Sequence, residues 1–347
     1  MRTVRRIMVS VLLWLIGTVT VAPPAGAHTT GGLQPTDYRT VVRSVTPRIA
    51  GVSARAVDLG SSIELSSSAR AEVTILGYDG EPYLRVGARG VYRNERSPAA
   101  FLNRSTKPTG GLPAGYDAKA EPRWRRIASG RTVRWHDHRA HWMGNSDPPA
   151  VRRDRSRAHV VIPDWRVPIR VGDRAASIRG SVVWVPPPTP TYWIVGAALL
   201  CVVVALAHRA RFWRWVTVSA LACLVAAAVV DVVGTWNASS ASGGSKLSSS
   251  AYAVMSALLG TAVMIALTRS RWRRAIPAVL FAGFGLFVVS GVGNVGVWFA
   301  SQLPTTAPDW LARSVPMIGL GVGAGLLIGS AMRLQPDEIE KTRSITS

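Results

Sequence analysis

The chain has 347 residues, of which 48% are hydrophobic, and it carries a formal net charge of +22 with a mean hydropathy of +0.19. This balance points to a membrane protein with a soluble part. The only two cysteines, Cys201 and Cys223, both fall in apolar segments, which excludes a disulfide within the soluble part.

Residues 1–27 have the pattern of a cleaved signal peptide. Arg2, Arg5 and Arg6 form a basic start, an apolar stretch covers residues 7–21, and the small residues 25–27 form a cleavage site. We exclude this segment from the fold. Cleavage after Ala27 makes His28 the first residue of the mature protein.

Residues 28–185 predict an exported all-β domain with an immunoglobulin-like sandwich fold. Short apolar runs flank Asp79-Gly80, and a second pair flanks Gly172-Asp173, as expected for tight hairpins. A long irregular insertion is expected from about 94 to 130. Between residues 28 and 190 the chain has 26 basic and 14 acidic side chains. On an exported domain this charge favours anionic lipid headgroups or an acidic envelope polymer as partner, or only a solvated surface, and argues against nucleic acid.

A proline-rich linker at 186–190 precedes a predicted five-helix transmembrane domain at 191–332 and a cytoplasmic tail at 333–347. The five apolar stretches cover about 191–207, 213–233, 251–268, 276–300 and 314–332. Ten basic residues fall in the segments assigned to the inside and two in the short outer ones, which places the N-terminal domain outside the cytoplasmic membrane and the C-terminus inside. In the last stretch Gly321, Gly325 and Gly329 form a small-residue ridge, suited to packing within the bundle or to a homo-oligomer.

A histidine cluster stands at "WHDHRAHWMG" (135–144), which holds three of the six histidines of the chain. If the strand continues through it, His136 and His138 project on one side and can chelate one ion. A turn after Arg139 can return His141 as a third ligand, and Asp137 can orient an imidazole from outside the coordination sphere. The alternative is a set of structural histidines packed on the neighbouring tryptophans.

His28 strengthens the metal hypothesis. An N-terminal histidine offers its amine and its own Nδ1 to one ion, and nitrogen-rich sites of this kind suit Cu(II). The metal residues expected from the sequence are therefore His28, His136, His138, His141 and Asp137, with copper as the cofactor. His159 reads as a strand-end residue rather than a ligand.

The mature first residue and the later His-x-His pair resemble the N-terminal-histidine site of CopC-like copper-resistance proteins, which are exported β-sandwiches. The resemblance implies copper binding through His28. The sequence departs from the CopC-like pattern at 171–174, where an Asp-Gly-His element has no counterpart.

The overall layout is similar to a family of uncharacterised actinobacterial multi-pass membrane proteins with an exported N-terminal domain. The segments that carry this resemblance are "PTDYRT" (35–40), "LGYDGEPYLRVG" (76–87), "SPAAFLNR" (97–104) and "WHDHRAHWMG" (135–144). The resemblance implies an architecture and no activity.

The sequence contains no phosphate loop, nucleophile elbow or metalloprotease helix, so a non-enzymatic role is expected. Two functions follow. The first is a membrane-anchored extracytoplasmic copper-binding protein for copper capture, buffering or delivery, with a copper-handling or envelope protein as partner. The second is a metal-free envelope protein whose basic sandwich binds an acidic polymer, lipid headgroups or a protein. An oxidative copper enzyme is a third possibility.

Overall fold

The computed structural model describes residues 33–105, 111–208, 210–238, 243–269 and 272–334. The chain divides into two compact units: a β unit, residues 36–186, and a helical unit, which comprises residues 187–347 together with 1–35. The expected signal peptide, His28 and the tail beyond residue 334 lie outside the described residues.

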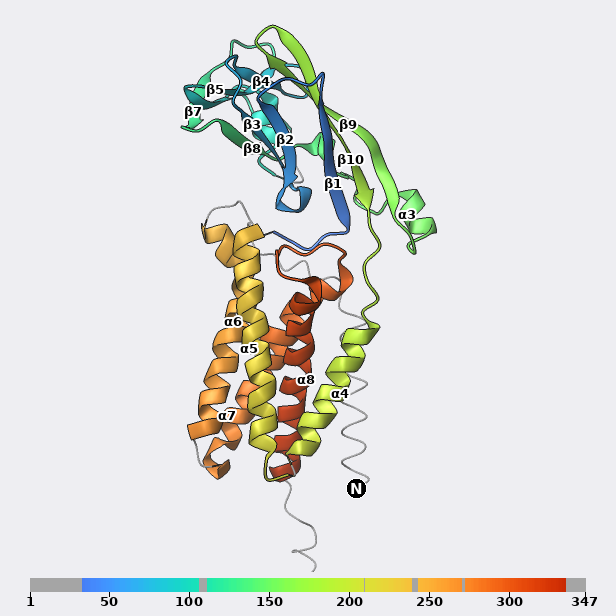
Figure 1. The fold of residues 1–347 in the computed structure, drawn as a ribbon, viewed down its shortest axis with the longest axis vertical. Coiled ribbons are helices and arrows are strands. Elements are labelled where there is room, and N and C mark those ends of the chain that lie inside the picture. The colour runs from blue at the N-terminus through green and yellow to red at the C-terminus, as the bar shows by residue number, and fades with distance from the viewer. Residues whose placement is uncertain (1–32, 106–110, 209, 239–242, 270–271, 335–347) are drawn as a thin grey trace, which may run out of the picture. The chain divides into compact units, whose positions relative to one another are not determined.

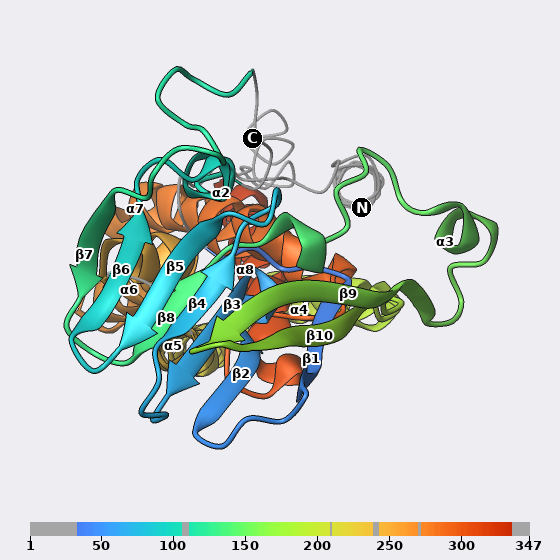
Figure 2. The same cartoon turned by 90° about the horizontal axis from the view of Figure 1, so that it is seen from above.

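The described residues of the β unit form ten strands, and all of their pairings are antiparallel. A large sheet has the order β1-β10-β9-β4-β5-β6-β7, and a small sheet has the order β2-β3-β8 (Figure 2). The strands are β1 (Tyr38–Thr46), β2 (Val52–Val57), β3 (Ser62–Ser67), β4 (Val73–Leu76), β5 (Pro82–Gly87), β6 (Gly90–Asn94), β7 (Trp124–Ala128), β8 (Thr132–Trp135), β9 (His159–Val171) and β10 (Arg174–Trp184). The expected all-β character is confirmed.

Both expected hairpins are present. The first joins β4 to β5 and the second joins β9 to β10, and Gly80 and Gly172 adopt positive φ angles of 81° and 56° at their turns. The expected irregular insertion is wrong in part, because it contains helix α2 (Pro98–Leu102) and strand β7. Strand β7 forms an edge of the large sheet and is exposed along most of its length, so it lacks the apolar alternation that would have revealed it.

One apolar core lies between the two sheets. The small sheet contributes Ile63, Leu65 and Val133, and the large sheet contributes residues such as Ile75 and Ile169, all of them buried. Alternate residues of each strand point into this core, which leaves the other face of each sheet to polar side chains. The core therefore determines which side chains the outer faces present.

The outer face of the small sheet carries a charged row. Register places Glu64 of β3 between Arg55 of β2 and Arg134 of β8, and both arginines donate to its buried carboxylate, Arg55 at 2.6 Å. Burial raises the pKa of Glu64, but the hydrogen bonds from the two arginines outweigh burial and hold it below its ordinary value.

Glu64→Gln is expected to lower the free energy of unfolding of the β unit by about 1–2 kcal/mol at pH 7. Because the folded pKa lies below the unfolded one, the stabilisation is present above the unfolded pKa and is lost as the pH falls below about 4.5. The unfolding midpoints of the full-length protein and the variant, followed by circular dichroism between pH 7 and pH 3, should converge in acid. A constant difference across this range would contradict the charge pairing.

The helical unit is a bundle of apolar helices (Figure 1). Within the part of the chain that the structure describes, four segments are long and apolar enough to cross a membrane: Trp213–Ala238, Ser250–Arg269, Val279–Phe299 and Asp309–Met332. The helices are α4 (Thr191–Ala207), α5 (Trp213–Ala238), α6 (Gly243–Arg269), α7 (Trp272–Gly285) and α8 (Asp309–Leu334). Of the five expected spans, the first corresponds to α4, which at 17 residues is shorter than the other four.

The span expected at 276–300 is not one regular helix. Helix α7 ends at Gly285, and a π-helical turn (Leu286–Gly291) and a 3-10 segment (Val292–Phe299) follow it. Glycines of α8 lie against this turn: a Cβ on Gly319 would stand 2.6 Å from Ser290, and one on Gly323 would stand 2.6 Å from Phe287. One face of this irregular segment thus packs closely against α8, and burial in protein is what makes backbone outside the helical hydrogen-bond pattern tolerable in a membrane.

The ridge of Gly321, Gly325 and Gly329 packs against α4. A Cβ on Gly321 would lie 2.8 Å from the Ala197 carbonyl oxygen, and one on Gly325 would lie 2.7 Å from Val204. Of the two uses that the sequence left open for this ridge, packing within the chain is the one observed. An oligomer contact of α8 would have to use another face.

Candidate functional site

The histidine cluster follows directly after strand β8. Trp135 is buried at the end of β8, and the strand stops there rather than continuing to Arg139. Asp137 then caps a short 3-10 turn, His138–Ala140, by accepting a hydrogen bond from the backbone N–H of Arg139. The strict alternation expected for a strand is therefore lost at the first histidine.

The Asp137 carboxylate is held by Trp135 and Arg139. This fully buried carboxylate accepts hydrogen bonds from Trp135 Nε1 at 2.9 Å and from Arg139 Nε and Nη2 at 2.8 Å each. Arg139 also donates to the carbonyl oxygens of Leu76 and Gly77, which ties the turn to the end of β4. Asp137 thus anchors the loop. Both of its carboxylate oxygens accept hydrogen bonds from Trp135 or Arg139 rather than from an imidazole.

The three imidazoles nevertheless come together. The rings of His136 and His141 stack with centroids 4.3 Å apart and planes 14° apart, and the ring of His138 meets His136 edge-on at 5.0 Å. His136 Nδ1 lies 2.7 Å from the Ser61 carbonyl oxygen, and His138 Nε2 lies 2.8 Å from that of Ser105. Each of these ring nitrogens must carry the proton, because a carbonyl can only accept.

Burial keeps two of these rings neutral. It lowers the pKa of His136, and it lowers the pKa of His141 to about 3. The Nε2 atoms of both rings are buried and have no hydrogen-bond partner among the described residues. A buried unpartnered nitrogen is costly, by about 1–3 kcal/mol, and a neutral imidazole nitrogen is also the form that binds a metal ion.

These residues fit a metal ion in part. A backbone carbonyl that accepts the Nδ1 proton, as at His136, is the usual arrangement that directs Nε2 to a metal. Within the described residues, however, no group of three or more His, Cys, Asp or Glu side chains is placed to hold an ion. The cluster thus offers two unpartnered nitrogens, from His136 and His141, but these stacked, nearly parallel rings would have to turn before both nitrogens could bind one ion, and further donors would have to come from elsewhere.

Two further histidines belong to the described residues. His159 begins β9, as expected, and its ring lies 6.2 Å from that of Trp184. His208 is buried in the helical unit against Trp213. His28 lies outside the described residues.

A second site, which sequence reasoning missed, is a row of side chains across the outer face of the large sheet. We call it the arginine face, and it comprises Arg85, Arg126 and Arg170 with Tyr92 and Trp124. Register pairs these strands in the order β9, β4, β5, β6 and β7, which lie side by side in Figure 2. The apolar neighbours of each arginine on β5 and β9 point into the core, so the arginines point outward.

Aromatic rings support the centre of the arginine face. The Arg85 guanidinium lies 4.4 Å from the Trp124 ring and 5.6 Å from the Tyr92 ring, and its Nε lies 3.2 Å from Glu72. Arg126 and Arg170 are exposed, and no carboxylate of the described residues lies within ion-pair distance of either. The alternation of arginine with apolar residues, as in Leu84-Arg85-Val86, was the sequence signal that could have revealed this face.

The site is thus a buried imidazole cluster with two unpartnered nitrogens, on a β unit that also presents an exposed arginine face. No family model, curated protein or solved structure matches the chain.

Proposed function

We propose that this chain is a membrane-anchored extracytoplasmic copper-binding protein that captures, buffers or delivers copper. The observation that carries the proposal is the pair of neutral, buried Nε2 atoms of His136 and His141, which lack a partner among the described residues. Nitrogen donors of this kind bind Cu(II) more tightly than they bind the other divalent ions of its row. His28 would complete the site with its amine and Nδ1, in the manner that the resemblance to CopC-like domains implies.

The residues have distinct roles in this proposal. His136 and His141 would donate nitrogens, and Ser61 would hold the His136 ring by accepting its Nδ1 proton. His138 would pack on His136 and, through Ser105, hold the adjoining loop. Asp137 would support the turn through Arg139 and would not touch the ion.

The proposed setting is the cytoplasmic membrane. The β unit would be an immunoglobulin-like sandwich outside, on a five-helix anchor in which α4 is the first span, with the C-terminus inside. The excess of arginine and lysine in the segments assigned to the inside supports this orientation. A copper-handling or envelope protein would receive the ion.

Copper titration tests the proposal. The purified full-length protein, confirmed by mass to begin at His28, is expected to bind one Cu(II) ion with a nitrogen-rich electron paramagnetic resonance spectrum. Absence of stoichiometric binding would overturn the copper function.

The arginine face favours a second candidate function, the binding of an acidic envelope polymer. Exposed guanidinium groups recognise phosphate and carboxylate with two parallel hydrogen bonds, and arginines spread over three strands of one sheet face match a linear chain of such groups better than a single small anion. The net positive charge of the β unit would attract such a chain from a distance.

Arg126→Glu combined with Arg170→Glu is expected to weaken binding of long-chain polyphosphate to the full-length protein about tenfold or more, because it reverses two unpaired charges. Binding should also weaken as salt is raised from about 0.05 to 0.3 M. Fluorescence anisotropy of labelled polyphosphate measures both. The matched control reverses Arg152 and Arg153, which are exposed in helix α3 (Pro149–Arg153). If both variants lose the same polyphosphate affinity, binding depends only on the net charge of the protein and not on the arginine face.

A further inference from the structure

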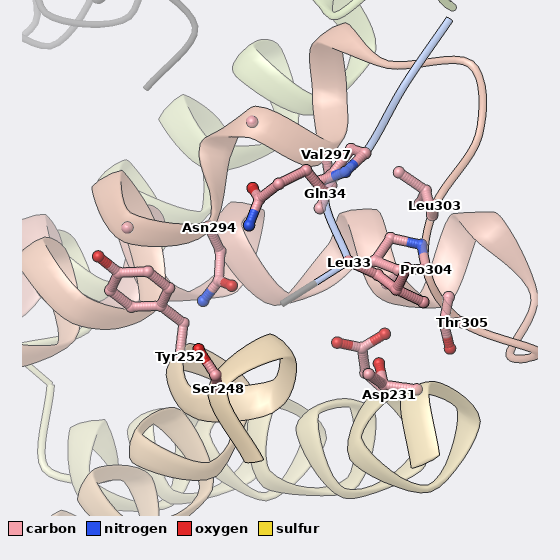
Figure 3. A pocket seen from close by; sticks show the side chains of 15 residues that line it. Leu33, Gln34, Asp231, Ser248, Tyr252, Asn294, Val297, Leu303, Pro304 and Thr305 are labelled. Atoms are coloured by element: carbon pink, nitrogen blue, oxygen red, sulfur yellow. The ribbon is translucent and has the colours of Figure 1, made fainter. Parts of the chain in front are cut away.

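The helical unit contains a cavity of about 110 Å³ with both polar and apolar walls, which neither proposed function uses. Its walls come from α5, α6, the 3-10 segment after α7, the loop before α8 and the described residues just before the β unit (Figure 3). The loop is held on α5 by the Thr306 N–H, which donates to the Gly234 carbonyl oxygen at 3.1 Å. The cavity is therefore a built feature of the bundle.

Asp231 of α5 provides the only carboxylate among the described lining residues, and no lysine, arginine or histidine is among them. Figure 3 shows its side chain directed into the cavity, with the Asn294 amide directed toward the same space from the opposite wall. The Thr305 hydroxyl hydrogen-bonds to this carboxylate. The other polar lining side chains are neutral and carry oxygen atoms; they are Gln34, Thr235, Ser248, Tyr252 and Asn294.

The broken span contributes backbone to this wall. The 3-10 segment Val292–Phe299 follows a π-helical turn, so several carbonyl groups leave the regular helical hydrogen-bond pattern. Gly293 and Gly296 of this segment line the cavity, and a Cβ on Gly293 would stand 2.6 Å from the Tyr252 ring. Carbonyl groups of interrupted membrane helices are recurrent ligands for small cations.

An ionised carboxylate within a membrane bundle needs a compensating charge, because hydrocarbon does not solvate it. Among the described lining residues no basic side chain supplies that charge. One carboxylate is neutralised by one monovalent cation, and oxygen atoms from hydroxyl, amide and backbone groups are the ligands that hard cations prefer. The volume is large enough for an ion with a few water molecules or for a small ammonium group.

We propose that this cavity binds a monovalent cation, with the Asp231 carboxylate as its charged ligand and the oxygens of Thr235, Ser248 and Asn294 around it. The site is chemically distinct from the histidine cluster, since it offers oxygen and no nitrogen or sulfur ligands. Copper binding by the β unit and cation binding by the helical unit should therefore respond to different substitutions.

Equilibrium binding of radioactive sodium to the full-length protein in lipid nanodiscs tests the proposal, with unlabelled sodium, potassium and methylammonium as competitors. We expect saturable binding of one ion per chain and at least a tenfold loss of affinity in Asp231→Asn. Competition by methylammonium alongside the alkali ions would place an organic cation in the same cavity, and the proposal for a monovalent cation would stand.

Asp173→Asn is the matched control, because it neutralises one exposed carboxylate in the turn between β9 and β10 and should leave sodium binding unchanged. Thr235→Val and Ser248→Ala keep the charge of the cavity and should weaken binding severalfold, so the proposal can be judged even where Asp231→Asn does not fold. Absence of saturable binding to the unmodified protein, or equal affinity in every variant, would overturn it. Copper binding should be unchanged in Asp231→Asn, so failure of the cation proposal can be distinguished from failure of the copper proposal.

Discussion

Replacing His136 and His141 together by alanine is expected to lower the Cu(II) affinity of the full-length protein by at least about 100-fold. Loss of a single supporting group around a metal commonly costs 10- to 100-fold, and this pair removes two direct nitrogen donors. The measurement is competition with a chelator of known copper affinity, and the electron paramagnetic resonance spectrum should lose nitrogen couplings in parallel.

Three further variants separate coordination from folding. His159→Ala is the control, since this residue begins β9 and lies outside the cluster. His138→Ala should cost less than the pair, because its Nε2 already bonds the Ser105 carbonyl. One extra residue placed before His28 should weaken binding by removing the terminal amine chelate. Unchanged affinity in the double variant would reject the cluster as the copper site and leave the histidines a structural role.

Asp137→Asn is expected to reduce the free energy of unfolding of the β unit by about 3–5 kcal/mol, the typical cost of removing one member of a buried ion pair. The carboxylate is fully buried and accepts hydrogen bonds from Trp135 and Arg139, so an amide in its place leaves the guanidinium without its counter-charge. Chemical denaturation of the full-length protein, followed by tryptophan fluorescence, measures the effect.

Asp173→Asn is the matched control and should change stability by less than about 0.5 kcal/mol, as exposed substitutions usually do. Adding Arg139→Gln to Asp137→Asn should recover part of the loss, because it removes the half-buried guanidinium that the first substitution leaves without a counter-charge. Asp137→Asn should leave copper affinity nearly unchanged in the protein that remains folded. A small stability loss combined with a large affinity loss would instead make Asp137 a metal residue.

The sequence by itself determined the features that depend on local chemistry. Asp79-Gly80 and Gly172-Asp173 specify tight hairpins because few other residues adopt positive φ at such turns. Four of the five apolar runs correspond to helices long and apolar enough to cross a membrane, because a bilayer requires length and hydrophobicity and little else. The three cluster histidines are close in the chain, and a turn was enough to predict that they meet.

The features that depend on distant residues were decided by the tertiary structure. Asp137 turns to Arg139 because the ends of β4 and β8 meet there, which no spacing within residues 131–144 reveals. Strand β7 forms by pairing with the open edge of β6. Helix α7 is followed by a π-helical turn at the place where glycines of α8 pack against it. The arginine face and the Asp231 cavity likewise join residues far apart in the chain. The periodicity of a sequence indicates which way a side chain points relative to its own backbone. Only the packing of the folded chain determines which residues that side chain contacts.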